Sequence, residues 1–211
     1  GVFAVEILQK HELRYSYLFP AIMSSAVAVY ICKVFGWQTF YPMDPVNEFM
    51  DVFILGWILL VAVLSGVLGW GYNNLYAVIS RRIKRDTTHN ILIKVLVGSI
   101  IASWLGWLIN PNILGTSRRI VYSLFSIDKS YLIGNLDFGI PFAVLLLILL
   151  SVKAFCNCLT VGSGMSAGFT SPTVIVGMLL GASIATIIGV SNGHANYYAC
   201  IAAGFAGMLA G

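Results

Sequence analysis

The chain has 211 residues, of which 59% are hydrophobic and only 9% are charged, and its formal net charge is +4. Soluble domains are about a quarter charged, so this composition excludes a soluble domain of useful size and indicates an integral membrane protein. The basic residues lie mostly beside apolar runs, where they orient membrane helices, so nucleic-acid binding is not indicated.

Seven hydrophobic runs divide the chain, and each is predicted to be a helix because lipid leaves the backbone of an open strand without hydrogen-bond partners. Most approach the ~20 residues needed to cross a bilayer, but the first and last are too short to span. The runs are Val2–Leu8, Tyr15–Phe35, Phe53–Ile79, Ile91–Ile109, Ile140–Val161, Thr173–Val190 and Tyr198–Ala210. We therefore expect an all-α, polytopic fold with one transmembrane domain over residues 1–211, excised from a longer protein because both ends fall inside apolar runs.

A basic cluster, residues 81–85, follows the third run. Basic residues beside membrane helices favour the cytoplasm, so we expect a cytoplasmic loop there and the acidic stretch around Asp44 on the outer side. Arg118 and Arg119 would also lie outside if Ile91–Ile109 crosses once. Either that run does not span simply, or the charge rule fails there.

Residues 110–139 have no regular hydrophobic period, and Pro111, Gly115 and Gly134 interrupt them. Glycine and proline are the strongest local breakers of helices and strands. A long loop with short helical pieces is the expected structure.

Two glycines in the sixth run, Gly177 and Gly181, have the G-x-x-x-G spacing of membrane helices that pack closely. The spacing is also common by chance in glycine-rich helices. It fits close helix packing.

All four cysteines lie in apolar segments, where a cysteine is usually a small hydrophobic residue. Cys156 and Cys158 could in principle bind a metal, but two thiols without a nearby histidine make a poor zinc site. We expect packing, and neither a metal nor a cofactor.

The most informative segment is the polar break at residues 162–172, Gly-Ser-Gly-Met-Ser-Ala-Gly-Phe-Thr-Ser-Pro. Pro172 suits the first turn of the next helix. The opening N–H groups of a helix have no partner within it and carry positive partial charge, so they attract anions. A helix that begins inside the membrane can therefore hold an anion weakly enough to release it. The alternative is a flexible turn between two hydrophobic helices.

The same break contains a formal G-x-S-x-G match centred on Ser166, the pattern of the hydrolase nucleophile elbow. That elbow requires a preceding strand and a nearby histidine. Here an apolar helix is expected before it, and His11, His89 and His194 lie outside the apolar runs. An intramembrane hydrolase stays an alternative of another class, but we expect no enzyme and no catalytic residue. A structural helical subunit without a transport role is a further alternative.

Three features of the sequence resemble the CLC family of chloride channels and chloride/proton antiporters. Residues 1–8 look like the family's helix in which an apolar run ends at a glutamate, here Glu6. Residues 162–172 look like its second-half anion motif, Gly-x-Phe-x-Pro, followed by a glycine-rich helix. The order and lengths of the helices between are similar to the family's middle portion.

The resemblance implies which residues hold the anion. In the family, two backbone amides at these positions contact the central chloride. Here the amides of Phe169 and Thr170 would do so, with Gly168 and Ser171 beside them. The family's Phe position holds Thr170, and Phe169 stands one place earlier, so the side chains at the site differ while the backbone donors are kept.

The resemblance also implies a CLC-like fold of tilted and broken helices, part of an inverted-repeat transporter domain. It implies a homodimer with a separate pore in each subunit, to whose contact residues 2–35 contribute. The family's chloride-coordinating serine and gating glutamate would precede Gly1, and its late pore-lining tyrosine would follow Gly211. Transmembrane chloride conduction by a CLC-type voltage-gated channel is the expected function.

A chloride/proton antiporter is the alternative. In the family's antiporters a second glutamate follows the helix-ending one and relays protons, whereas Ile7 follows Glu6 here. An aliphatic side chain carries no proton, which favours a passive channel. Glu6 could instead pair with Lys10 four residues later.

Lys153 lies deep in an apolar run, where a charge is costly and marks a functional candidate, here a pore residue that raises the positive potential. Its alternative is to snorkel from near a helix end. Lys94 lies near the start of its run, and there snorkelling is expected.

Overall fold

The computed structural model describes residues 15–36, 53–85, 90–126, 129–134, 139, 141–165, 168, 170–190 and 193–210. The chain divides into two compact units, Gly1–Pro42 and Met43–Gly211. Every regular element in the described residues is helical, so the all-α prediction is confirmed. The prediction of one transmembrane domain over the whole chain stays a prediction.

The first unit contains one described helix, α2 (Tyr15–Val34), as its apolar run predicts. Pro20 lies inside this helix. Large apolar side chains such as Phe19, Val27 and Tyr30 are exposed along it. The predicted helix Val2–Leu8 lies outside the described residues.

The second unit follows the predicted runs closely. Its elements are α3 (Ile54–Arg85), α4 (Ile91–Ile109), η1 (Pro111–Ile113), α5 (Arg118–Phe125), α6 (Ser130–Ile133), α7 (Phe142–Gly162), α8 (Thr170–Ile187) and α9 (Ala195–Ala210). The short η1, α5 and α6 confirm the irregular segment expected at residues 110–139.

One expectation was wrong: residues 81–85 are not a loop but the last turn of α3, which ends at Arg85. Arginine and lysine are good helix formers. Their positive charges also complement the negative partial charge at a helix C-terminus. The basic cluster therefore continues the helix beyond its apolar stretch.

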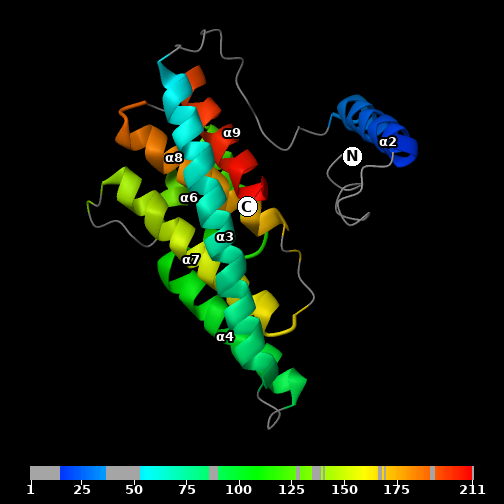
Figure 1. Ribbon diagram of the computed structural model, residues 1–211, viewed down its shortest axis with the longest axis vertical. Helices are drawn as coiled ribbons and strands as arrows, with labels where there is room; N and C mark the ends of the chain where they lie inside the picture. Colours follow the sequence, from blue (N-terminus) through cyan, green and yellow to red (C-terminus); the bar gives the residue numbers. More distant parts are fainter. Residues whose placement is uncertain are drawn as a thin grey trace. The chain divides into compact units, whose positions relative to one another are not determined.

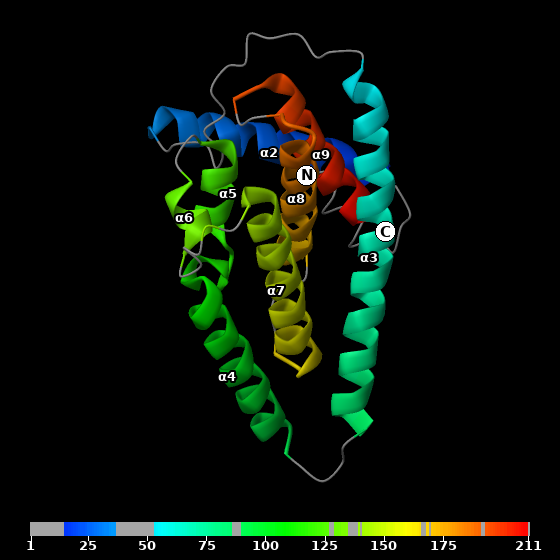
Figure 2. The ribbon, with the colours of Figure 1, turned by 90° about the vertical axis from the view of Figure 1, so that its left-hand side faces the viewer.

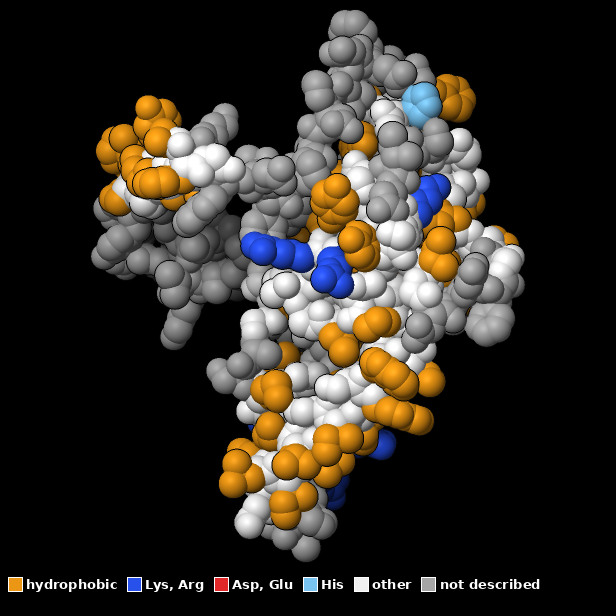
Figure 3. Space-filling model, turned by 180° about the vertical axis from the view of Figure 1, so that it is seen from behind, with side chains coloured by type: hydrophobic (Ala, Val, Ile, Leu, Met, Phe, Trp, Pro, Cys, Tyr) orange, Lys and Arg blue, Asp and Glu red, His pale blue; other side chains and the backbone are white. Residues whose placement is uncertain are grey.

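Four helices of the second unit, α3, α4, α7 and α8, are long and apolar enough to cross a membrane, whereas α9 has 16 residues. Hydrophobic side chains cover much of the lower half of the unit in Figure 3, over the end that α3 and α4 share. The molecule is a multi-pass integral membrane protein.

Helix α7 lies at the centre of the unit, where it packs against α3, α4 and α8. Figures 1 and 2 show α3 and α4 running to the same end of the unit, with α7 between them. Helices α8 and α9 pack against each other and against α3.

Glycines bring α8 and α9 into backbone contact. A Cβ atom added at Gly177 would overlap the Gly204 carbonyl oxygen, and one at Gly181 would overlap the Cys200 carbonyl oxygen. The close packing predicted from the G-x-x-x-G spacing is confirmed. This contact fixes the direction in which α8 runs from its first turn.

Candidate functional site

The first turn of α8 lies at mid-height of the helical unit. Ser171 and Pro172 in that turn share a cavity with Ser99 and Ser103 of α4 and with Lys153 of α7. Ser99 and Ser103 are the ninth and thirteenth of the 19 residues of α4, and Lys153 is the twelfth of the 21 of α7. The start of α8 therefore faces the middle of two membrane-crossing helices, and Figure 2 shows α8 beginning partway along α3.

The cavity has a volume of about 460 Å³. Four parts of the chain enclose it: the middle of α4, the segment 113–116, the second half of α7, and the connection into α8. Its polar lining includes Ser99, Ser103, Thr116, Asn157, Thr160, Ser171 and the ammonium-bearing Lys153. No lining side chain among the described residues is a carboxylate, so the lining suits an anion better than a cation.

Lys153 is held in the cavity wall by backbone carbonyls. Its side chain is only 4% exposed, so it does not snorkel to a helix end. The Nζ atom donates to the carbonyl oxygens of Ile113 at 2.6 Å and Gly115 at 2.7 Å. An ammonium has three donors, and these two bonds leave one for the cavity that Lys153 lines.

The carbonyls that hold Lys153 are positioned by Asn110, a residue that the sequence did not single out. Asn110 is fully buried. Its Nδ2 donates to the carbonyls of Tyr131 at 2.9 Å and Leu132 at 3.1 Å, and its Oδ1 accepts from the Asn112 N–H at 2.9 Å. Asn110 thus ties the end of α4 to η1 and α6. Asparagine directly before proline at the end of an apolar run was the only available signal.

A second polar cluster joins three helices behind the cavity. The Asn157 amide of α7 donates to the Tyr72 hydroxyl of α3. Tyr72 is also hydrogen-bonded to Thr173 in the first turn of α8. Because Asn157 lines the cavity, this cluster fixes the start of α8 relative to the wall that carries Lys153. Nothing in the local sequence pattern connects these three residues.

The structure brings part of the predicted anion site to the cavity. Gly168 and Ser171 line it, and Thr170 is the first residue of α8 and is half-buried. Pro172 is the third residue of α8, in the first turn as expected. Phe169, Glu6 and Ile7 lie outside the described residues, so their predicted roles stay predictions.

Of the residues in the hydrolase alternative, Ser166, His11 and His89 lie outside the described residues, so it stays an alternative. Cys156 and Cys158 face different neighbours, since their thiols contact the carbonyls of Ala102 and Tyr72 respectively. The two thiols therefore do not converge on one metal position.

A family model described as "Voltage gated chloride channel" matches residues 1–211, which is the whole chain. No curated protein and no solved structure matches. The matched region includes the polar break before α8 and every helix that lines the cavity.

Proposed function

This chain belongs to the voltage gated chloride channel family, so its general function is CLC-type chloride conduction or exchange, and we propose that the cavity beside Lys153 holds the anion. The observation that carries this proposal is the position of the first turn of α8, which opens at mid-height onto a cavity lined by hydrogen-bond donors. Gly168, Phe169, Thr170 and Ser171 are the proposed anion-binding residues.

The electrostatics support a site that binds an anion and releases it. The N-terminus of a helix carries roughly half a positive charge, spread over its unpaired N–H groups. The Lys153 ammonium adds a full charge, but it is shared with the Ile113 and Gly115 carbonyls. Partial charges and a tethered ammonium attract chloride without the permanent pairing that would stop conduction.

For the mode of transport we propose a passive channel. The support comes from the sequence, where Ile7 follows Glu6 at the position at which the family's antiporters have a second, proton-relaying glutamate. An isoleucine cannot carry a proton. The antiporter is the competing candidate, because Glu6 itself is present.

The intact protein is proposed to be a homodimer with one pore in each subunit. In this arrangement α2 contributes to the subunit contact. The support is the composition of α2, which is apolar along its 20 residues and carries large side chains such as Phe19 and Tyr30. Such a helix is suited to contact with a second helix or with lipid.

A substitution that removes one backbone N–H group tests the anion site directly. Thr170→Pro removes the amide proton at the first position of α8, where proline is tolerated because that N–H has no partner within the helix. Thr170→Ala removes the side chain and keeps the amide. A hydrogen bond to a charged group contributes about 1.5–3 kcal/mol, so we expect chloride to bind at least about tenfold more weakly to the proline variant.

The measurement is calorimetric titration of chloride into the intact protein in detergent, together with thermal melting of both variants. The alanine variant should bind like the parent protein. Equal chloride affinity in the proline and alanine variants would reject the Thr170 amide as a ligand.

A further inference from the structure

Two hollows adjoin at the end of the unit that α3 and α4 share. The larger, about 440 Å³, lies between the last turn of α3, the first half of α4 and Leu159 of α7. The smaller, about 210 Å³, lies between the ends of α3 and α7 and the start of α4. Both are lined by Ile83 and Lys94. Neither shares a lining residue with the anion cavity, so they form a separate feature.

The two hollows differ in chemical character. Apolar side chains dominate the larger, with Ile93, Val97 and Ile101 from α4. These three residues recur every fourth position, so they form one stripe about 12 Å long on the helix face. They are 50%, 47% and 43% exposed. The stripe is therefore open to whatever surrounds the protein in the membrane.

Basic side chains lie at one end of this stripe. Arg82 lines the larger hollow, Lys84 lines the smaller, and Lys94 lines both. Arg82 and Lys84 are exposed. The Lys94 Nζ atom donates to the Ile83 carbonyl at 2.9 Å, which holds this ammonium at the junction of the two hollows. Three basic residues thus line the two hollows around the end of the apolar stripe.

A glycine keeps the floor of the larger hollow open. Gly98 lines it, and a Cβ atom there would lie only 2.7 Å from the Cβ atom of Ser163, the residue that follows α7. The absence of a side chain lets α4 approach α7 closely and leaves space above the contact. The hollow therefore follows from the packing of α4 on α7.

We infer that this pair of hollows binds an anionic phospholipid, with its phosphate at Arg82, Lys84 and Lys94 and an acyl chain along Ile93, Val97 and Ile101. Positive side chains complement the lipid phosphate, and the apolar stripe begins beside them. A phospholipid presents one phosphate next to long hydrocarbon chains, and basic hollows between membrane helices suit such headgroups. The end of α3 also carries the basic cluster expected on the cytoplasmic side, where anionic lipids are enriched.

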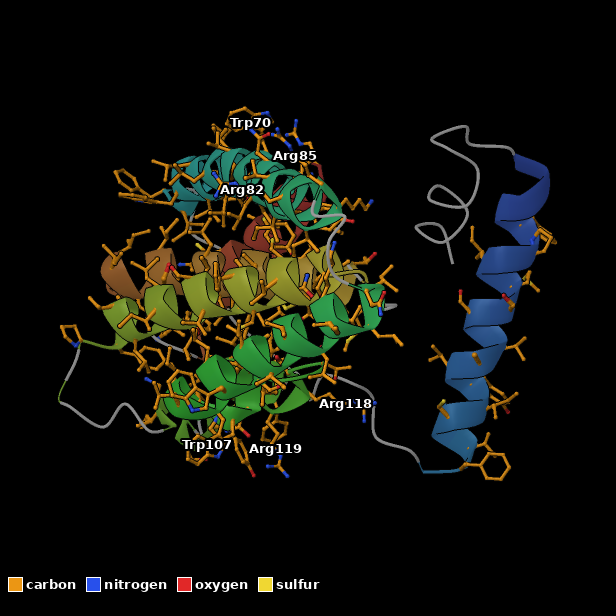
Figure 4. All side chains as sticks on the ribbon, turned by 90° about the horizontal axis from the view of Figure 1, so that it is seen from below. Trp70, Arg82, Arg85, Trp107, Arg118 and Arg119 are labelled. Carbon is orange, nitrogen blue, oxygen red and sulfur yellow. The ribbon has the colours of Figure 1, made fainter. Side chains whose placement is uncertain are left out.

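The first test removes charges at the hollow and, separately, at a distant site. Arg82→Gln with Lys84→Gln removes two charges beside the hollows. Arg118→Gln with Arg119→Gln removes two from α5, which Figure 4 shows on the opposite flank of the unit. All four side chains are exposed. Native mass spectrometry of the intact protein in detergent would measure binding of phosphatidylglycerol and of phosphatidylcholine.

We expect phosphatidylglycerol to bind more tightly than phosphatidylcholine. Each basic residue near a membrane surface contributes about 1 kcal/mol, which is about fivefold in affinity. The Arg82/Lys84 double variant should therefore bind phosphatidylglycerol about 25-fold more weakly, while the Arg118/Arg119 double variant binds it as the parent does.

The second test fills the apolar stripe. Val97→Trp places a large ring in the larger hollow, whereas Leu96→Trp places the same ring on an exposed position that does not line it. Only Val97→Trp should weaken lipid binding, and thermal melting would verify that both variants fold. Chloride titration of the same variants keeps this result separate from the anion site.

Three outcomes would overturn the inference. They are equal affinity for the two lipids, equal weakening by the matched control variants, and displacement of phosphatidylglycerol by glycerol phosphate at similar concentrations. The last would mean that the basic residues bind a free phosphate rather than a lipid.

Discussion

At the scale of single residues, Lys153 is the only Lys or Arg among the described residues that line the cavity. A lysine in the middle of an apolar helix is costly unless its ammonium has partners. The Ile113 and Gly115 carbonyls supply them from a segment about 40 residues earlier in the chain, at 2.6 Å and 2.7 Å. The charge is therefore retained close to the start of α8.

Lys153→Met should lower chloride affinity by about tenfold, which corresponds to about 1.4 kcal/mol. The cause is the loss of a nearby positive charge and of its hydrogen-bond donors. The control is Lys129→Met, because Lys129 is exposed and lies over the Phe142 ring, outside the cavity lining. Chloride flux from proteoliposomes and calorimetric titration would measure the effect, and unchanged values for Lys153→Met would contradict a pore role.

At the scale of elements, the helices meet through small residues. The buried positions of α4 are Gly98, Ala102 and Gly106, spaced by four, while large side chains such as Leu96 and Ile100 are exposed. Membrane helices associate largely by close van der Waals packing of small side chains, since lipid is as apolar as leucine. Glycines carry the α8–α9 contact in the same way.

The α8–α9 contact gives a prediction about stability. Gly177→Ala adds a Cβ atom that would overlap the Gly204 carbonyl oxygen, and overpacking of this kind typically costs about 1–3 kcal/mol. We expect a clearly lower melting temperature in detergent. Gly71→Ala on α3 is the matched control because a Cβ atom there meets no other atom within 4 Å. A glycine-to-alanine change in an open helical position should instead stabilise slightly.

The length of α3 is a second feature at this scale. Its 32 residues span about 48 Å, whereas the hydrocarbon core of a bilayer is about 30 Å thick. The helix must tilt or extend beyond the core, and its basic last turn accounts for part of the excess. This geometry places Arg81, Arg82 and Lys84 where lipid headgroups are expected.

At the scale of the whole molecule, the open question is whether chloride movement is coupled to protons. A channel dissipates a chloride gradient without moving protons, whereas an antiporter converts that gradient into proton transport. We propose that Ile7 occupies the position of the proton-relaying glutamate of the family's antiporters, and we therefore expect chloride flux without proton uptake in proteoliposomes of the intact protein. The measurement is intravesicular pH during chloride efflux.

Ile7→Glu provides the matched comparison, since it introduces a carboxylate at the proposed relay position. Uphill proton movement in the parent protein would reject the channel assignment. Proton movement that appears only in the Ile7→Glu variant would support the alignment on which the assignment depends.

The sequence by itself determined where the helices lie, because an apolar run long enough to cross a bilayer has no alternative to helical structure. It also determined the break before Pro172 and the start of α8 near it, since these depend on local residues. The end of α3 was missed, because basic residues continue a helix as readily as they end an apolar run.

Only the tertiary structure decided which residues surround the start of α8. Helices that are apolar on every side carry no periodic signal for the face that is buried, so the neighbours of α4 and α7 could not be read from their sequences. The partners of Lys153, the bonds of Asn110 and the Tyr72–Asn157–Thr173 cluster all join residues far apart in the chain. Such contacts depend on how whole helices pack, which no local pattern encodes.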